Sequence, residues 1–442
     1  MGHKYVDVHC HLFNKDILSR WLRILIAVAE SEPFVPTSNW LNADLKRASH
    51  LDFLKRLKMF LDIGTKEDST AVYDEMIKTY GGAYRSVPLM LDIAYISTAD
   101  EYKAMMEEFL KEDWLLSRLD SLVDNLRDNS DDRGKKELAG IEAIREAARE
   151  VKEMYYGFKE HARKVKGEML IPVFDVRNSF QTQIDQLTAL KNKCGDMVYP
   201  FLSVDPRRPD ILEIVKKLVG RENIFHGIKL YPPIGFSPTD PVLFGDGGLY
   251  AYCQEKRIPV TSHCSLGGFA TYADKATVSG HIYDVKTNAL RKVSNQTIEF
   301  ECHFFPQVHK AIEERAQTLN NPDIWKLVVE RYPDLYLNLA HLGGKSEDWR
   351  TKILNMMDDK NRLYSDLACH TNPLVLQSIK AKIFDGQLSP AMSRIMYGSD
   401  YYILILFTSD FGKYLHSFEE TFASCFDAIS AVNAEEFLFK RG

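Results

Sequence analysis

The sequence predicts an α/β fold whose sheet is largely parallel. Short runs of β-branched and apolar residues recur along the 442-residue chain, and amphipathic stretches separate them. Eight of these runs are the candidate strands, at residues 5–11, 88–95, 198–204, 225–231, 258–263, 335–341, 363–370 and 395–400. A single (β/α)8 TIM barrel with large helical insertions accommodates both this number of strands and this chain length.

One further run competes for a place in the sheet. Residues 169–176, "MLIPVFDV", have as strong a strand pattern as residues 88–95, so one of the two is expected to lie outside the barrel. The pattern leaves that choice open. The amphipathic segment 211–219 follows Asp210 and stops before Gly220, two residue types that commonly begin and end helices, which predicts a crossover helix.

Three segments are longer than a crossover between adjacent strands requires. We expect them to be insertions into one elaborated barrel domain of residues 1–442. Residues 13–84 and 99–168 are mainly amphipathic and are expected to form solvated helices that cover the barrel; the alternative is a lid or a subunit interface. Residues 266–334 are the third insertion, between the fifth and sixth barrel strands.

Composition excludes several classes of function. A hydrophobic content of 45% with 27% charged residues is that of a globular protein with a sizeable core. The net charge of −6 and the absence of a basic stripe argue against nucleic acid and favour a small-molecule substrate. Seven irregularly spaced Cys predict reduced thiols. The sequence has no membrane-length apolar run and no signal-peptide pattern, so we expect a cytoplasmic protein without membrane association.

The first candidate strand ends in "VDVHCHLF", which offers three potential metal ligands in a row. Alternate side chains of a strand share one face, so His9 and His11 point one way and Cys10 points the other, with the apolar residues. The apolar face packs against the helices. We therefore expect His9 and His11 to project into the barrel mouth as a chelating pair, and Cys10 to be buried behind the strand.

Later strands deliver polar side chains to the same end of the barrel. Strand alternation points Lys229 inward in "FHGIKLYPP" and His263 inward in "IPVTSHCS", while Cys264 falls on the back. His341 ends an apolar strand before a Gly pair, and Asp400 ends the last strand. The carboxyl ends of the strands are where (β/α)8 enzymes assemble their active sites.

Five motifs, "DVHCH", "GIKLYP", "SHCS", "AHLGG" and "GSDYY", together resemble the amidohydrolase superfamily. Within it, the chain is similar to the amidohydrolase-related (type 2) branch, which includes hydrolases, lactonases and aminocarboxymuconate semialdehyde decarboxylase. The motifs run from the first strand to the last, so the resemblance covers the barrel but not the insertions.

The resemblance implies a metal centre. His9, His11, His263 and Asp400 would bind one or two divalent ions, most often zinc, with manganese or iron as alternatives. A water molecule activated by the metal would be the nucleophile. Asp400 would also accept the proton of that water and pass it to the leaving group, and His341 would polarise the scissile carbonyl or hold the developing oxyanion.

Three further residues have two interpretations each. Lys229 is either carboxylated and bridges two metals, or it binds an anionic substrate as an ammonium group. Arg207, next to Arg208 in "VDPRRP", either clamps a substrate carboxylate or forms a surface salt bridge. His370, which shares an inward face with Asp366, either contacts the substrate or packs behind the site. His303 and His309 are poorly spaced for joint ligation on one helix and are set aside.

These observations predict a metal-dependent hydrolase that acts on a small amide, ester or lactone. The alternative within the same branch is non-oxidative decarboxylation of a small unsaturated or aromatic carboxylic acid. A second alternative is a binding protein that keeps the barrel site without turnover. By analogy with the family, we expect a homodimer.

Overall fold

The computed structural model describes residues 5–14, 56, 59–60, 62–64, 66–96, 176–304, 307–388, 390–408 and 410–440. The predicted insertion at 99–168, much of the insertion at 13–84, and residues 169–175 of the ninth strand candidate lie outside this part of the chain. Val176, the last residue of that candidate, begins a helix.

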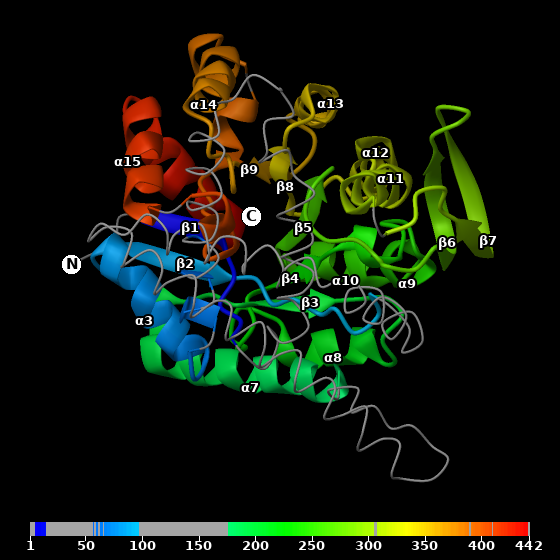
Figure 1. Cartoon of the computed structure of the whole chain (residues 1–442), viewed down its shortest axis with the longest axis horizontal. Helices are drawn as coiled ribbons and strands as arrows, with labels where there is room; N and C mark the ends of the chain where they lie inside the picture. Colours follow the sequence, from blue (N-terminus) through cyan, green and yellow to red (C-terminus); the bar gives the residue numbers. More distant parts are fainter. Residues whose placement is uncertain are drawn as a thin grey trace, which may run out of the picture.

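Parallel strands form the barrel, which Figure 1 shows. They are β1 (Tyr5–Cys10), β2 (Tyr84–Pro88), β3 (Phe201–Val204), β4 (Gly227–Leu230), β5 (Val260–Ser265), β8 (Leu337–Gly343), β9 (Leu363–Asp366) and β10 (Ile395–Met396). One sheet has the order β10-β9-β8-β5-β4-β3, and β1 pairs with β2. Parallel bridges join the two sheets, from Ser86 to Val198 on one side and from Cys10 to Tyr401 on the other. The ring is therefore closed, which confirms the predicted (β/α)8 barrel.

The second strand lies earlier than predicted. β2 runs over Tyr84–Pro88, and pairing continues only as a single bridge at Leu89, so the strand prediction for residues 88–95 was wrong over most of its length. The error has a physical cause, because Met90 and Leu91 are buried although they lie outside any strand. An apolar run that is buried in a loop cannot be told from a strand by hydrophobicity alone.

Helices cover the outside of the barrel (Figure 1). They are α3 (Ser69–Tyr80), α7 (Val176–Cys194), α8 (Ile211–Leu218), α9 (Pro241–Phe244), α10 (Leu249–Lys256), α11 (Val308–Asn320), α12 (Pro322–Arg331), α13 (Glu347–Met356), α14 (Pro373–Lys380), α15 (Phe411–Thr421) and α16 (Asn433–Phe439). The predicted crossover helix is α8, whose Ile211 and Val215 are buried one turn apart. Asp210 precedes it, but the Asp210 side chain makes no capping hydrogen bond.

Between β5 and β8 the chain forms an antiparallel hairpin, β6 (Lys275–Asp284) and β7 (Ala289–Glu299), followed by α11 and α12. The hairpin extends away from the barrel in Figure 1. Arg315 of α11 is fully buried and donates hydrogen bonds to the carbonyl oxygens of Ala273, before β6, and Cys302, after β7, at the base of the hairpin. This arginine fixes α11 to the base of the hairpin.

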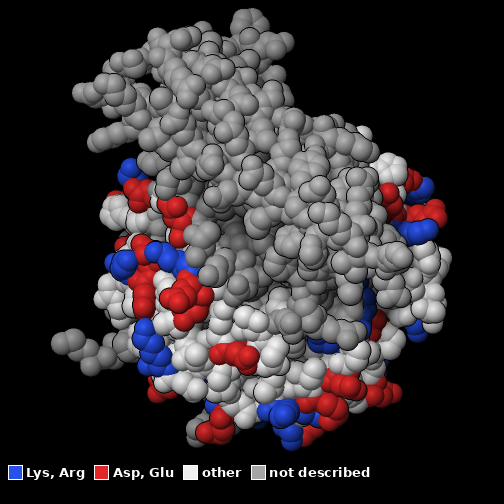
Figure 2. Space-filling model, turned by 60° about the horizontal axis from the view of Figure 1, so that its bottom comes forward, with Lys and Arg blue, Asp and Glu red and all other residues white. Residues whose placement is uncertain are grey.

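Two features of the described part of the chain bear on the predictions about membranes and nucleic acids. None of its helices combines the length and apolar character that crossing a membrane requires. On the face drawn in Figure 2, the basic and acidic side chains that are coloured are interspersed rather than gathered into a patch of one sign.

The barrel interior leaves no room for a side chain at Gly227. A Cβ atom there would lie 2.5 Å from the carbonyl oxygen of Pro259 and 2.6 Å from Cζ of Phe201. We expect Gly227→Ala to lower the free energy of unfolding by roughly 1–3 kcal/mol, because both neighbours are held by packing. Urea unfolding measures this, with Gly267→Ala as the control, since a Cβ at Gly267 meets nothing within 4 Å. Equal midpoints for the two variants would contradict this packing.

Candidate metal centre

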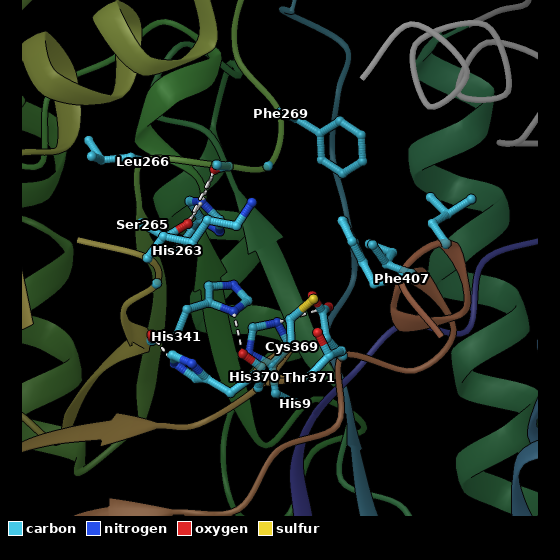
Figure 3. Close-up of a pocket in the computed structure, with 18 of the residues that line it drawn as sticks. His9, His263, Ser265, Leu266, Phe269, His341, Cys369, His370, Thr371 and Phe407 are labelled. Carbon is cyan, nitrogen blue, oxygen red and sulfur yellow. Dashed lines mark hydrogen bonds and ion pairs between the residues drawn. The ribbon is translucent and has the colours of Figure 1, made fainter. Parts of the chain in front are cut away.

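The barrel strands bring all the predicted site residues except Arg207 to one cavity of about 390 Å³. His9 comes from β1, Lys229 from β4, His263 from β5 and His341 from β8, and Asp400 follows β10. All five side chains are buried. Figure 3 shows His9, His263 and His341 close together on one side of this cavity. Cys10 does not line it and belongs to the apolar core instead.

His11 is oriented by a backbone carbonyl group. Its Nδ1 lies 2.8 Å from the carbonyl oxygen of Leu89. Because a carbonyl oxygen only accepts hydrogen bonds, Nδ1 carries the ring proton and Nε2 keeps its lone pair. That Nε2 lies 3.3 Å from Oδ1 of Asp400. Burial lowers the pKa of His11, so the ring is neutral at neutral pH.

His9 is oriented by a carboxylate. Its Nδ1 donates to Oδ2 of Asp366 at 3.1 Å, which leaves the lone pair on Nε2. Nε2 lies 3.6 Å from Oδ1 of Asp400, the same oxygen that His11 faces. Burial, together with the charge of Lys229, lowers the pKa of His9 to about 3. His9 is therefore a neutral imidazole with an available lone pair.

Asp366 accepts hydrogen bonds from His9 and from several neighbouring groups. Besides His9, this carboxylate accepts hydrogen bonds from Nδ2 of Asn338 at 2.8 Å and from the backbone N–H groups of His341 at 3.0 Å and Ala368 at 3.1 Å. Burial raises the pKa of Asp366, but the contacts with His9 and His341 outweigh burial and keep the pKa below its ordinary value. Asp366 is thus a buried, fully bonded carboxylate behind His9.

Three hydrogen-bond acceptors face one another in this arrangement. Nε2 of His9 and Oδ1 of Asp400 are buried without a hydrogen-bond partner in the described structure, and Nε2 of His11 faces that same oxygen. One ligand atom each of His9, His11 and Asp400 lies within 4.8 Å of the others. Lone pairs held this close are unfavourable unless a cation lies between them, so the group fits a divalent metal ion.

His341 stands beside this group. Its ring centroid lies 4.7 Å from that of His9 and 4.8 Å from that of His263. Nδ1 of His341 donates to the carbonyl oxygen of Ala368 at 3.2 Å, so Nε2 keeps its lone pair. His341, His9 and Asp366 form a second group whose ligand atoms lie within 4.8 Å of one another.

His263 and Lys229 line the cavity but belong to neither ligand group. Nε2 of His263 donates to the carbonyl oxygen of Gly267 at 2.8 Å, and its ring stacks on Tyr231 at 4.3 Å between centroids. Nδ1 of His263 and Nζ of Lys229 are both buried and have no hydrogen-bond partner among the described residues. Burial lowers the pKa of Lys229 to about 8, although Asp366 and Asp400 oppose the shift.

The structure does not bring Arg207 to the cavity. Its guanidinium binds Asp205 through Nε at 2.9 Å and Nη2 at 2.6 Å, and it is absent from the cavity lining. This ion pair corresponds to the salt-bridge interpretation rather than to a substrate clamp. Arg208 likewise binds Asp92. His370 does line the cavity, and its Nε2 donates to the carbonyl oxygen of His341 at 2.9 Å.

Two parts of the site were not assigned from the sequence. Asp366 was noticed only as an inward-facing neighbour of His370, yet it makes the hydrogen bond that orients His9. His309 was set aside, and Glu313 was not considered, but both line the cavity from α11. The position of Asp366 at the end of a predicted strand could have identified it as a site residue. No feature of the sequence identifies His309 and Glu313, because only tertiary packing places α11 beside the cavity.

The fold and site define a (β/α)8 barrel with a buried cluster of histidines and carboxylates at the carboxyl ends of its strands. The family model described as amidohydrolase matches residues 6–422. The chain therefore belongs to the amidohydrolase family. A search of curated proteins finds no match to it.

Several solved structures are similar to the chain at low identity. Manganese-bound 5-carboxyvanillate decarboxylase from Novosphingobium aromaticivorans is 11% identical, with 99% of this chain and 97% of that chain covered and a TM-score of 0.48. A 2,6-dihydroxybenzoate decarboxylase is 10% identical, with 99% of each chain covered and a TM-score of 0.45. A probable 2-pyrone-4,6-dicarboxylic acid hydrolase from Acinetobacter baumannii is 11% identical, with 57% and 78% covered and a TM-score of 0.37. These similarities do not decide the reaction.

The hydrogen bond from His9 to Asp366 yields a prediction for metal affinity. Asp366→Asn removes the negative charge behind the imidazole and makes His9 a weaker ligand. We expect the dissociation constant for zinc to rise about 10- to 100-fold. Competition with a chromogenic chelator measures it, with the exposed Asp359→Asn as the control. An unchanged dissociation constant in Asp366→Asn would show that His9 does not bind the metal.

Proposed function

We propose that this protein is a metal-dependent hydrolase that acts on a small amide, ester or lactone. The observation that carries the proposal is the convergence of Nε2 of His9, Nε2 of His11 and Oδ1 of Asp400, three acceptors with no proton between them. Membership of the amidohydrolase family supports an enzyme of this kind, because the match spans the barrel from β1 to α15.

His9, His11 and Asp400 would hold the ion. Nδ1 of His263, which is buried without a hydrogen-bond partner among the described residues, is a further nitrogen available in the same cavity, on the ring next to His341. A divalent ion bound here acts as a Lewis acid and lowers the pKa of a water molecule to about 7. Two imidazoles and a carboxylate suit zinc, and manganese and iron are the alternatives.

Asp400 is the group proposed to move the proton. Its carboxylate is buried at the floor of the cavity, and a carboxylate within hydrogen-bond reach of the attacking water accepts a proton and passes it to the leaving group. Burial raises the pKa of Asp400, but the nearby imidazole groups of His11, His9 and His341 outweigh burial and leave the pKa below its ordinary value. Asp400 is therefore ionised at neutral pH.

His341 is proposed to stabilise the substrate oxygen. Because its Nδ1–H is already donated to Ala368, the ring can donate to a substrate only through a second proton on Nε2. An N–H group at Nε2 would then face the developing oxyanion, in a cavity that the apolar side chains of Phe269, Leu406 and Phe407 also line.

Non-oxidative decarboxylation is the second candidate, and Lys229 favours it. Nζ of Lys229 is buried without a partner beside Tyr231, in a cavity whose wall includes Phe269 and Phe407. An ammonium group in such a place would bind the carboxylate of an aromatic acid. If Lys229 were instead carboxylated, it would serve a second metal. Decarboxylation releases carbon dioxide and hydrolysis does not, so product analysis separates the two reactions.

The central role of Asp400 can be tested by removing its charge. Zinc-loaded protein is screened against 4-nitrophenyl esters, lactones and anilides, and against hydroxybenzoic acids with detection of carbon dioxide. We expect turnover of an ester, amide or lactone, and a fall in kcat of about 10²- to 10⁴-fold in Asp400→Asn. The exposed Asp334→Asn variant is the control.

Three outcomes of this screen would contradict the proposal. Carbon dioxide release without hydrolysis would establish the second candidate. Unchanged kcat in Asp400→Asn would remove Asp400 as the proton acceptor. Unchanged zinc affinity in the same variant would remove it from the metal centre.

A further inference from the structure

Helix α11 reaches the mouth of the cavity with two polar side chains. His309 and Glu313 are one turn apart on this helix, so they share a face, and both line the cavity. Each is 46% exposed, whereas the metal-centre residues are buried. The pair therefore lies at the solvent end of the cavity, opposite the floor where His9, His11 and Asp400 converge.

Apolar side chains line other parts of the same cavity. They include Leu266, Phe269 and Phe407, and Figure 3 shows the two phenylalanine side chains set apart from the histidine group around His341. A substrate that fills the cavity has a reacting group at the floor, a mainly apolar body and a second end beside α11. The second end is where the chain can distinguish one substrate from another.

Glu313 is the charged group at the mouth that is best placed to distinguish substrates by their second end. Of the described residues that line the cavity, Asp400 and Glu313 carry the carboxylates. Oε2 of Glu313 lies 3.9 Å from Nε2 of His309, beyond hydrogen-bond distance, and their contact with each other is the only ion pair found for either in the described chain. Lys345 also lines the mouth, but it already interacts with another part of the chain.

We propose that Glu313, with His309 beside it, determines substrate specificity by binding a cationic, hydrogen-bond-donating group at the end of the substrate remote from the reacting group. A carboxylate only accepts hydrogen bonds, and its charge attracts an ammonium group and repels a carboxylate. The substrate class is thus a small amide, ester or lactone with an apolar body and a distal amine. This inference rests on the proposed function, because the metal centre defines which end reacts.

Hydroxamates test the inference without knowledge of the substrate, because they chelate divalent metals. The zinc-loaded protein is titrated at pH 8 with benzohydroxamate, with its 4-(aminomethyl) and 4-(2-aminoethyl) derivatives, and with 4-carboxybenzohydroxamate. We expect at least one amine to bind roughly two- to fivefold more tightly than benzohydroxamate, the range for a half-exposed charge pair, and the 4-carboxy derivative to bind more weakly.

Two variants assign this preference to Glu313. Glu313→Gln keeps the size of the side chain and removes its charge, so we expect the amine preference to disappear while benzohydroxamate affinity and zinc content stay unchanged. Glu330→Gln is the matched control, since Glu330 forms a similar i,i+4 pair with Lys326 on the next helix, α12. That variant should keep the full preference.

The outcomes separate this inference from the proposed function. Tight binding of benzohydroxamate with no amine preference, or a preference that persists in Glu313→Gln, would overturn the role of Glu313 and leave the metal centre intact. A preference for the 4-carboxy derivative would assign selectivity to Lys345 instead. Failure of benzohydroxamate to bind at all would overturn the proposed metal centre, and the inference with it.

Discussion

The repulsion between three buried lone pairs is the constraint on which the site depends. His9 and His11 each donate one ring N–H to a fixed acceptor, Asp366 and the carbonyl group of Leu89, and so each must present its other nitrogen as an acceptor. Both of these nitrogens face Oδ1 of Asp400. Unpaired lone pairs held this close are unfavourable in an apolar interior. A divalent cation bound between them would remove the repulsion and gain three ligand bonds.

Barrel closure is what makes this arrangement possible. Asp400 and His9 come from opposite ends of the chain, and the backbone N–H of Asp400 donates to the carbonyl oxygen of His9 at 2.7 Å. Just beneath them, Ser399 donates to both carboxylate oxygens of Asp7, through its backbone N–H and its hydroxyl group. These contacts close the ring and hold two of the proposed ligands in place at the same time, so stability of the barrel and geometry of the site are coupled.

Strand alternation and strand ends predicted much of this arrangement, because both follow from local chain geometry. Alternation predicted that His9 and His11 point to the cavity and Cys10 to the core, and the structure has them there, with His11 just beyond the end of β1. It could not predict what Asp366 does, since that carboxylate meets His9 and other partners from different strands. The sequence pattern also did not identify His309 and Glu313 of α11, and it extended β2 into a buried loop. Tertiary packing determines both the position of α11 and the residue at which β2 ends.

Metal content per chain, measured by plasma mass spectrometry on protein purified without chelators, is the most direct test of the account. We expect one or two equivalents of zinc, manganese or iron, and a value of two would favour a carboxylated Lys229 as the bridge between them. Essentially no metal, with none taken up on reconstitution, would contradict it. His9, His11 and Asp400 would then need another cation or a proton to explain their geometry.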